Sequence, residues 1–353
     1  MRKLKARTVV FAICCCVLAF PLRGSCDELT VSYSSENLSM AERYEERLDT
    51  LEAKFETQPT SMTCCCPGWF ADIDYLNWKP RQAGLGVAVL DPVGAGVPSG
   101  GQPIQSLNFG RNSGLRVGIG RRTITGWDVG LKYTYFESDD SLAFAPGNGQ
   151  VLAMLSSPAT GLTNADSVNA AANLRLNIVD LEAGRCFRLA ECATARASIG
   201  LRYASLDEEL RVRYDGAAFA GGLVDAPHDF SGFGGRMGGE IHWDLTNRLS
   251  VFGQLGVALL AGEIQSSRRE ENAGAVIIDV TDGVDQVVPI VDMSVGAEWQ
   301  RGPVGLSAGY ELSNWFNVVG RTDFADSFNG GSIDDGGTDL GFDGFFVRLT
   351  YVR

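Results

Sequence analysis

The chain has 353 residues, a formal net charge of −13 at pH 7 and 43 glycines. Its acidic balance leaves no basic patch to neutralise phosphates, which argues against a nucleic-acid-binding protein. Beyond the N-terminus, no stretch approaches the roughly 18 consecutive apolar residues of a transmembrane helix. These averages suit a glycine-rich β-protein, either a soluble one or a barrel in lipid.

The N-terminus predicts a signal peptide over residues 1–26. A basic start is followed by an apolar run, 9–20, which is too short to span a bilayer and is broken by Pro21. We place the cleavage near Cys26. Lipidation of Cys26 is the alternative, although Arg23 stands where a lipobox favours a large apolar residue. An exported chain is periplasmic, secreted or inserted in the outer membrane of a Gram-negative-type bacterium.

Residues 27–67 predict a periplasmic helical segment followed by a linker. Between residues 36 and 58 a narrow apolar seam of about three heptads lies among charged residues. The seam consists of Ala41, Tyr44, Leu48, Leu51 and Phe55. Such a short coiled coil needs partner helices, so this segment is either a homo-oligomerisation or tethering element, or a solvated linker helix. Near the following Cys64, Cys65 and Cys66, no histidine or second cysteine pair stands at ligand spacing, so we expect no metal.

Residues 68–353 alternate apolar and polar side chains with the period of a β-strand. In the clearest stretch Trp127, Val129 and Leu131 share one face, whereas Asp128 and Lys132 lie on the other. The predicted strands span 69–78, 113–122, 126–136, 173–186, 194–206, 233–244, 249–261, 288–300, 303–313 and 342–352. In the fourth of them the apolar residues change face near Ile178, where we expect a β-bulge.

The connections between these strands alternate in length. Tight ones at 123–125, 187–193, 245–248 and 301–302 separate long ones at 79–112, 137–172, 207–232, 262–287 and 314–341. Short turns at one end and long loops at the other are typical of outer-membrane barrels, and a Greek-key sandwich has no reason to show them. The pattern predicts an all-β fold, an antiparallel up-and-down transmembrane β-barrel. It has about 10 strands, or about 12 if loop segments such as 275–280 add strands.

Aromatic residues gather at the ends of the predicted strands, as the girdles of a membrane barrel do. Trp69, Trp127, Trp243, Trp299 and Tyr351 border the short turns, and Trp78, Tyr135, Tyr203 and Tyr310 lie toward the long loops. Between the two bands one face is apolar and is expected to contact lipid. The opposite face is expected to line the lumen with Arg116, Lys132, Arg196, Arg202, Arg236, Glu240, His242, Asp244, Asp292, Glu298, Glu311 and Arg348.

Several segments also resemble a known family. They are WFADIDYLNWKP (69–80), SGLRVGIGRRTITGWDVGLKYTYFES (113–138), LNIVDLEAGRCF (176–187), ASIGLRYASLDEEL (197–210) and GPVGLSAGYELSNWFNV (302–318). Together they resemble the Legionella-type major outer membrane protein family over roughly residues 68 to 353. The resemblance implies a pore-forming outer-membrane β-barrel.

Other polar residues suggest local chemistry. Cys186 and Cys192 flank a short turn and predict a disulfide in an oxidising compartment. His228 falls in a long connection and is expected to be solvated. The acidic loop at 323–339 contains Asp323, Asp326, Asp334, Asp335 and Asp339. It is either a Ca²⁺ site unlike an EF-hand or an exposed loop without metal.

Two functions fit these expectations, and neither is enzymatic. His242 has Glu240 and Asp244 two residues away on one face, which we interpret as part of a charged lumen and not as a catalytic group. We expect no cofactor. Ten strands leave a lumen only modestly wider than eight strands do. The chain is thus either a narrow pore for small solutes or ions, or a non-conducting structural or adhesion barrel tethered through its N-terminal helix.

Overall fold

The computed structural model describes residues 67–94, 101–157, 160–319, 322–324, 333–335 and 337–353. The predicted signal peptide, the helical segment 36–58 and the three cysteines at 64–66 lie outside these residues. The described residues belong to one compact unit, Gln58–Arg353. In that described part, no helix has the length and apolar content needed to cross a membrane.

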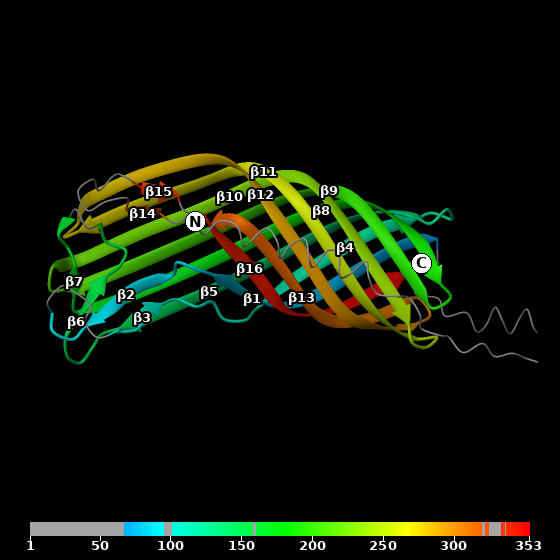
Figure 1. Cartoon of the computed structure of the whole chain (residues 1–353), viewed down its shortest axis with the longest axis horizontal. Coiled ribbons are helices and arrows are strands. Elements are labelled where there is room, and N and C mark those ends of the chain that lie inside the picture. The colour runs from blue at the N-terminus through cyan, green and yellow to red at the C-terminus, as the bar shows by residue number, and fades with distance from the viewer. Residues whose placement is uncertain (1–66, 95–100, 158–159, 320–321, 325–332, 336) are drawn as a thin grey trace, which may run out of the picture. The chain divides into compact units, whose positions relative to one another are not determined.

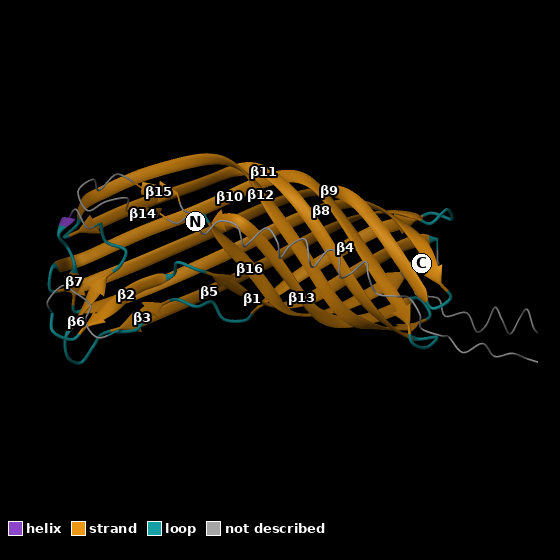
Figure 2. Cartoon of the chain, viewed as in Figure 1, coloured by secondary structure: helices purple, strands orange, loops and turns teal. Residues whose placement is uncertain are grey.

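Ten antiparallel strands close into a barrel (Figures 1 and 2). They are β1 (Gly68–Gln82), β4 (Asn112–Arg122), β5 (Trp127–Phe144), β8 (Ser167–Ala190), β9 (Ala193–Gly216), β10 (Phe219–Asp244), β11 (Leu249–Asn272), β12 (Ala275–Arg301), β13 (Val304–Val319) and β16 (Thr338–Val352). Around the ring the order is β1-β16-β13-β12-β11-β10-β9-β8-β5-β4, and β4 pairs with β1 to complete it. The predicted all-β, antiparallel ring of ten strands is confirmed.

The two ends of the barrel differ. At the turn end, the connections 123–126, 191–192, 245–248 and 302–303 are tight, and the first and last strands meet where the Trp69 N–H donates to the Arg353 carbonyl at 2.9 Å. Alongside the outer parts of the long strands, β2 (Gly86–Asp91), β3 (Ile104–Ser106), β6 (Gln150–Ala153) and β7 (Asn164–Ala165) form a small sheet (Figure 1). A separate short hairpin consists of β14 (Thr322–Phe324) and β15 (Ile333–Asp335).

Two of the predicted long loops are wrong, because the strands run through them. Segments 207–232 and 262–287 continue as β9, β10, β11 and β12, which meet in two-residue turns at 217–218 and 273–274. Ala273 and Gly274 have φ values of 51° and 75°, the left-handed pair that a type I′ hairpin turn requires. Residues 275–280 therefore lengthen β12 and add no further strand to the ring.

Part-way along each long strand, the polarity of the inward and outward side chains is exchanged. In β8, Leu174, Leu176 and Ile178 point inward and are buried, and the next inward residues are the charged Asp180 and Glu182. The outward residues change in the opposite sense, from polar to apolar. Pairing with both neighbours is continuous past Ile178, and the one register shift comes later, between Arg188 and Ala190. The predicted β-bulge is therefore wrong. The alternation of inward and outward residues continues through Ile178, and what changes there is which of the two faces carries the apolar side chains.

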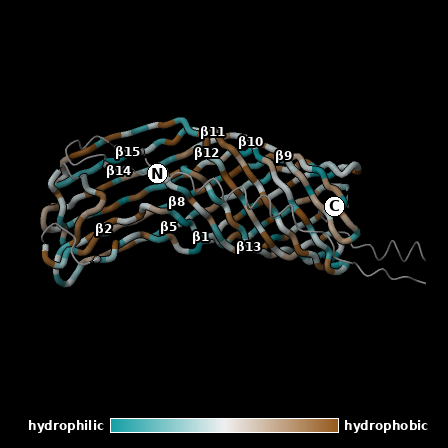
Figure 3. The backbone as a smooth tube through the Cα atoms, viewed as in Figure 1, coloured by the Kyte–Doolittle hydropathy of each residue, from teal (hydrophilic) through white to brown (hydrophobic). Residues whose placement is uncertain are grey.

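The level of this reversal divides the barrel into two parts. Toward the turn end lies an outward-facing apolar belt, formed by the outward residues of 69–75, 115–121, 127–135, 179–187, 195–203, 233–243, 249–261, 287–299, 304–312 and 345–351. Its height matches the roughly 9–11 residues of a membrane-spanning strand. Beyond it is the outer extension, where most outward residues are polar and most inward ones apolar, as in a soluble protein. Figure 3 shows brown and teal residues alternating along the strands.

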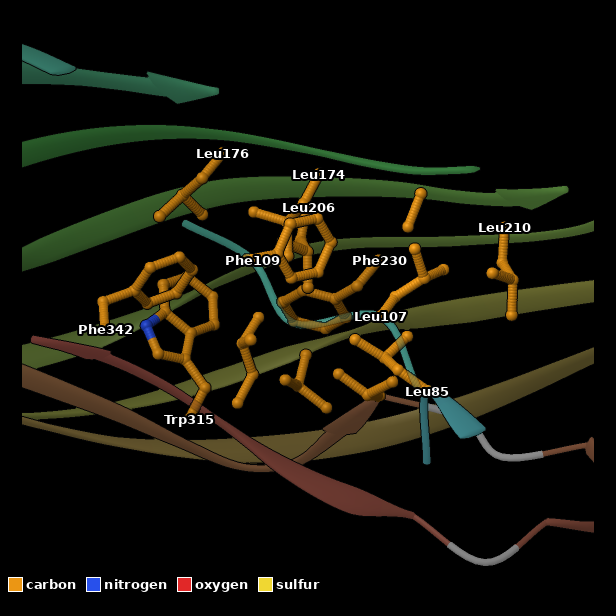
Figure 4. Packing of buried hydrophobic residues seen from close by; sticks show 14 of the residues in the cluster. Leu85, Leu107, Phe109, Leu174, Leu176, Leu206, Leu210, Phe230, Trp315 and Phe342 are labelled. Atoms are coloured by element: carbon orange, nitrogen blue, oxygen red, sulfur yellow. The ribbon is translucent and has the colours of Figure 1, made fainter. Parts of the chain in front are cut away.

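The outer extension encloses an apolar core (Figure 4). Its largest fully buried side chains include Leu174, Leu176, Leu206, Phe230, Trp315 and Phe342. The segment between β1 and β4 adds the buried Leu85, Leu107 and Phe109 to this core. The inside of the barrel is therefore filled by packed side chains above the charged level.

Trp78 belongs to this interior and not to an aromatic girdle, so its predicted place is wrong. The side chain is 3% exposed, and its ring centroid lies 5.5 Å from that of Phe136 and 5.7 Å from that of Phe342. Trp78 shares its parity along β1 with Asp74 and Leu76, which also face inward. Its position at a strand end suggested a girdle, but the alternation of the strand places it inside.

Candidate functional site: the charged interior

At the level of the apolar belt, the inward side chains form a charged layer that crosses the bore. It contains Asp72, Asp74, Arg116, Asp128, Lys132, Asp180, Glu182, Arg196, Arg202, Arg236, Glu240, His242, Asp292, Glu298, Glu311 and Arg348. Because ions inside a barrel wall are removed from bulk water, each needs an oppositely charged partner nearby. Most of these ions meet this need in three groups of ion pairs. Lys132 has Asp72 as its oppositely charged neighbour in the lining of one cavity.

The first group is centred on Asp74, which is fully buried. Its carboxylate accepts hydrogen bonds from Arg348 at 2.8 and 2.9 Å and from Arg116 at 3.1 Å. Arg116 also donates to Glu311, at 3.2 and 3.3 Å. The indole N–H of Trp78 donates to the same Glu311 at 2.7 Å, which ties the charged layer to the apolar core above it.

The second group is centred on Arg202 and Arg236 of neighbouring strands. Arg202 donates to Asp180 at 2.6 and 2.9 Å and to Asp292 at 2.9 Å. Arg236 donates to Glu182, and its other nitrogen lies 3.6 Å from Asp292. Both arginines are buried, with 4% and 7% of their surface exposed. This arrangement links β8, β9, β10 and β12 across the lumen.

The third group lies nearest the turn end. Arg196 donates to Asp128 at 2.6 Å and lies 3.6 Å from Glu182. The His242 Nε2 is 2.6 Å from Glu240, its Nδ1 is 3.6 Å from Glu298, and its ring stacks on Phe252 at 5.4 Å. Asp244 ends β10 at the edge of this group. Its carboxylate interacts electrostatically with His242, and its N–H donates to the Cys192 carbonyl at 2.8 Å.

Two small cavities remain within the charged layer. One, of about 90 Å³, is lined by residues of the third group, and the other, of about 60 Å³, by residues of the first two. Lys132 and Glu182 line both, so these two side chains stand between the cavities. Each has room for only a few water molecules, since one water occupies about 30 Å³ of liquid.

Five acidic residues of the layer escaped the sequence-based prediction. Asp74, Asp128, Asp180 and Glu182 are the principal partners of the predicted arginines, and Asp72 lines a cavity beside Lys132. None of the five was among the predicted lumen residues. The signal was available, because Asp128 shares a strand face with Lys132. Parity along each strand, followed from a known inward residue, would have found all five.

Most of the predicted girdle residues lie on the outer surface at the two edges of the apolar belt. Trp69, Trp127, Trp299 and Tyr351 are exposed near the turn end, with Trp243 half-buried beside them. Tyr203 is exposed at the opposite edge, where Tyr135 and Tyr310 are half-buried. Guanidinium groups cover two of the rings, with Arg121 5.7 Å from Trp69 and Arg185 5.6 Å from Trp127. Such amphipathic rims suit a headgroup layer.

Two local predictions need correction, and most of a third lies outside the described residues. The Cys186–Cys192 disulfide is wrong, because Cys186 is in a disulfide whereas Cys192 keeps its thiol. His228 is not solvated. It points inward from β10, is 5% exposed and contacts Ser266 at 2.9 Å and the Val318 carbonyl at 2.8 Å. Within the acidic loop, the side chains of residues 323–335 lie outside the described part. In the residues that are described, no cluster of His, Cys, Asp and Glu is arranged to hold a metal.

Comparisons with known proteins were made on sequence and on structure. The family model described as the Legionella pneumophila major outer membrane protein precursor matches residues 61–353. No curated protein matches the chain.

Similar solved structures include three bacterial proteins. The outer membrane protease OmpT from Escherichia coli has 10% identity and a TM-score of 0.49, covering 81% of this chain and 97% of that one. The translocator domain of the autotransporter NalP from Neisseria meningitidis has 11% identity and a TM-score of 0.37, covering 89% and 96%. The P. putida toluene transporter TodX has 10% identity and a TM-score of 0.33, covering 84% and 92%.

Proposed function

Because the chain belongs to the family of the Legionella pneumophila major outer membrane protein, an outer-membrane β-barrel family, we propose that it is a barrel whose bore is closed. In this proposal it is a structural protein of the outer membrane and does not conduct solutes in the conformation described. The observation that carries the proposal is that the bore is occupied at two successive levels. Paired ions cross it at the apolar belt, and the apolar core crosses it in the outer extension.

A narrow ion pore is the second candidate, and one observation favours it. The two cavities of the charged layer lie in series, separated by Lys132 and Glu182, and they are lined by charges of both signs. A shift of these two side chains would join the cavities. Conduction would still require a path through the packed rings of Trp78, Phe136 and Phe342 above them.

Conductance in planar lipid bilayers decides between the two candidates. A closed barrel is expected to give no discrete current steps in 1 M KCl, although protease protection and heat-modifiable gel mobility show that it has inserted and folded. Discrete steps from the wild type would refute the closed barrel. If steps occur, Lys132→Glu should shift the reversal potential toward cation preference, because Lys132 lies between the two cavities.

We propose the orientation usual for outer-membrane barrels, with the turn end in the periplasm and the outer extension outside the cell. Residues 36–58 would then be periplasmic and could bring copies of the chain together or tether the barrel to the envelope. Chemical cross-linking of whole cells tests this. A full-length chain that yields neither oligomers nor cell-wall adducts would contradict the tethering role.

We also propose that the protein is not an enzyme. His242 lies between two carboxylates inside the charged layer and stacks on Phe252, an arrangement that suits an ion-pair partner. Replacement of His242 by alanine should leave the folded protein without any change in hydrolytic activity toward ester and peptide substrates. Loss of such an activity in His242→Ala would refute the proposal.

A further inference from the structure

The outer extension contains a cavity separate from the charged layer. Its volume is about 390 Å³, which falls in the range of about 300–1,000 Å³ typical of small-molecule sites. One side is formed by inward residues of β9, β10 and β11, and the other by segments 82–86, 104–107 and 154–155. Figure 4 shows three of its lining side chains, Leu85, Leu107 and Leu210.

Slightly more than half of the cavity wall is hydrocarbon. Leu85, Leu107 and Val224 are at most 5% exposed, and Leu155 and Leu210 complete the same surface. Water gains little from contact with such a wall, whereas an apolar molecule of suitable size gains the free energy of leaving water. The wall therefore favours an occupant that is largely apolar.

One end of the cavity carries hydrogen-bond acceptors that the described residues leave unused. Glu208 is 5% exposed. Its Oε1 accepts from the Gln82 amide at 2.6 Å, and within the described structure its Oε2 has no hydrogen-bond partner. The side-chain amide oxygen of Gln82, Oε1, and the hydroxyl of Thr338 likewise lack a partner among the described atoms. Buried acceptors without a donor are costly, by about 1–3 kcal/mol each. The occupant should therefore donate a hydrogen bond.

The charges around the cavity disfavour an ionic occupant. Arg268 lines the same cavity and is 3% exposed, so its positive charge offsets the negative charge of an ionised Glu208. His228, opposite Glu208 in the β9–β10 pairing, bonds to the Val318 carbonyl and to Ser266, and burial lowers its pKa, which keeps it neutral. A cation would meet Arg268, and an anion would meet Glu208.

From these observations we infer that the cavity binds a small, uncharged, apolar molecule that carries a hydroxyl group. The hydrocarbon part lies against Leu85, Leu107 and Leu210. The hydroxyl donates its hydrogen to the unused Oε2 of Glu208. This inference does not depend on whether the barrel conducts.

Binding of 2-naphthol to the full-length barrel in lipid nanodiscs tests the inference. Equilibrium dialysis at pH 8, where the Glu208 carboxylate is ionised and accepts hydrogen bonds, measures bound probe, and empty nanodiscs of the same lipid correct for partition into the bilayer. We expect saturable binding at one site per barrel. Naphthalene, which lacks the hydroxyl, and 2-naphthoate, which is anionic, should each bind at least tenfold more weakly.

Variants then assign the binding to Glu208. Glu208→Leu should weaken 2-naphthol binding at least tenfold, whereas Glu209→Gln, the next residue on the exposed face of β9, should leave it unchanged. If Glu208→Leu does not refold, Gln82→Leu serves in its place and should weaken binding several-fold. Absence of saturable binding would mean that water alone fills the cavity. The absence of saturable binding would overturn the inference. Two other results would do the same: equal binding of naphthalene and 2-naphthol, or wild-type affinity for 2-naphthol in a refolded Glu208→Leu or Gln82→Leu variant.

Discussion

Replacement of Asp74 by alanine is the most direct test of the charged layer. The Asp74 carboxylate is fully buried and joins Arg348 and Arg116, so its removal leaves two buried guanidinium groups without their shared partner. Breaking a buried ion pair by removing one partner costs about 3–5 kcal/mol. Glu311, 3.2 Å from Arg116, still compensates one of the two cations. We therefore expect Asp74→Ala to lower the free energy of unfolding by about 3–5 kcal/mol, and not by twice that amount.

Urea titration of the barrel refolded in detergent micelles measures this loss, with tryptophan fluorescence and heat-modifiable gel mobility as independent signals. Asp139→Ala is the matched control, because Asp139 is exposed on the same barrel wall and no ion pair of the described structure involves it. Its unfolding midpoint should equal that of the wild type. The double variant Asp74→Ala/Arg348→Ala should lose less than the sum of its two single variants, by about 0.5–3 kcal/mol.

A free energy of unfolding for Asp74→Ala within about 0.5 kcal/mol of the wild-type value would contradict this expectation, since an ordinary surface substitution has an effect of that size. Strict additivity in the double variant would contradict it as well. Either result would mean that water enters the charged layer and solvates Arg348 and Arg116 when their carboxylate is absent. The layer would then be a hydrated lumen, which favours the narrow pore over the closed barrel.

Four further substitutions probe the two parts of the barrel. Trp78→Ala, which removes a buried ring and its bond to Glu311, should cost about 3–5 kcal/mol in the same urea titration, and a loss under about 1 kcal/mol would contradict the packed core. Gly234→Ala should abolish refolding, because a Cβ would lie 1.8 Å from the Leu259 carbonyl oxygen, whereas Gly235→Ala, with nothing within 4 Å, should refold normally. Burial raises the pKa of Glu208 from 4.5 to about 7, so the stability that comes from its protonated form is present below pH 4.5 and is lost as the pH rises to about 7. Glu208→Gln, which shares His228 and Arg268 with the wild type, should therefore gain about 3 kcal/mol relative to it between pH 4.5 and pH 8, and parallel pH profiles would refute this.

The sequence predicted the ring of strands well because lipid imposes one simple rule. Within the apolar belt every second residue is apolar, as in Trp127, Val129 and Leu131, and the tight turns separate such runs clearly. Ten runs of this kind predicted ten strands. The charged residues between them also marked most of the layer inside the barrel.

The outer extension escaped prediction because the same alternation carries the opposite chemistry there. In β9, Leu206, Leu210 and Val212 point inward while Asp207 and Glu209 point outward, so the segment looked like a polar loop. Its period of two was intact. The error lay in requiring apolar residues to face outward along the whole strand, and the same assumption misplaced Trp78 and His228.

The cysteines show a second limit. Cys186 and Cys192 are close in sequence and flank a turn, which suggested a bond between them. Cys186 stands on an inward position of β8, near the end of the strand. Proximity in sequence indicates which cysteines can meet, but strand parity decides where their sulfurs point.

The change from apolar to polar outward residues along each strand also sets the depth at which the barrel sits in the bilayer. Sliding the barrel by two residues, roughly 6–7 Å along a strand, would carry Glu137, Glu263 and Asp285 into hydrocarbon. Sliding it the other way would lift aliphatic side chains into water on many strands at once. The free energy of the barrel in the bilayer therefore has a single narrow minimum as a function of depth. A bilayer of different thickness must thicken or thin around this protein, because moving the barrel along the membrane normal would not relieve the mismatch.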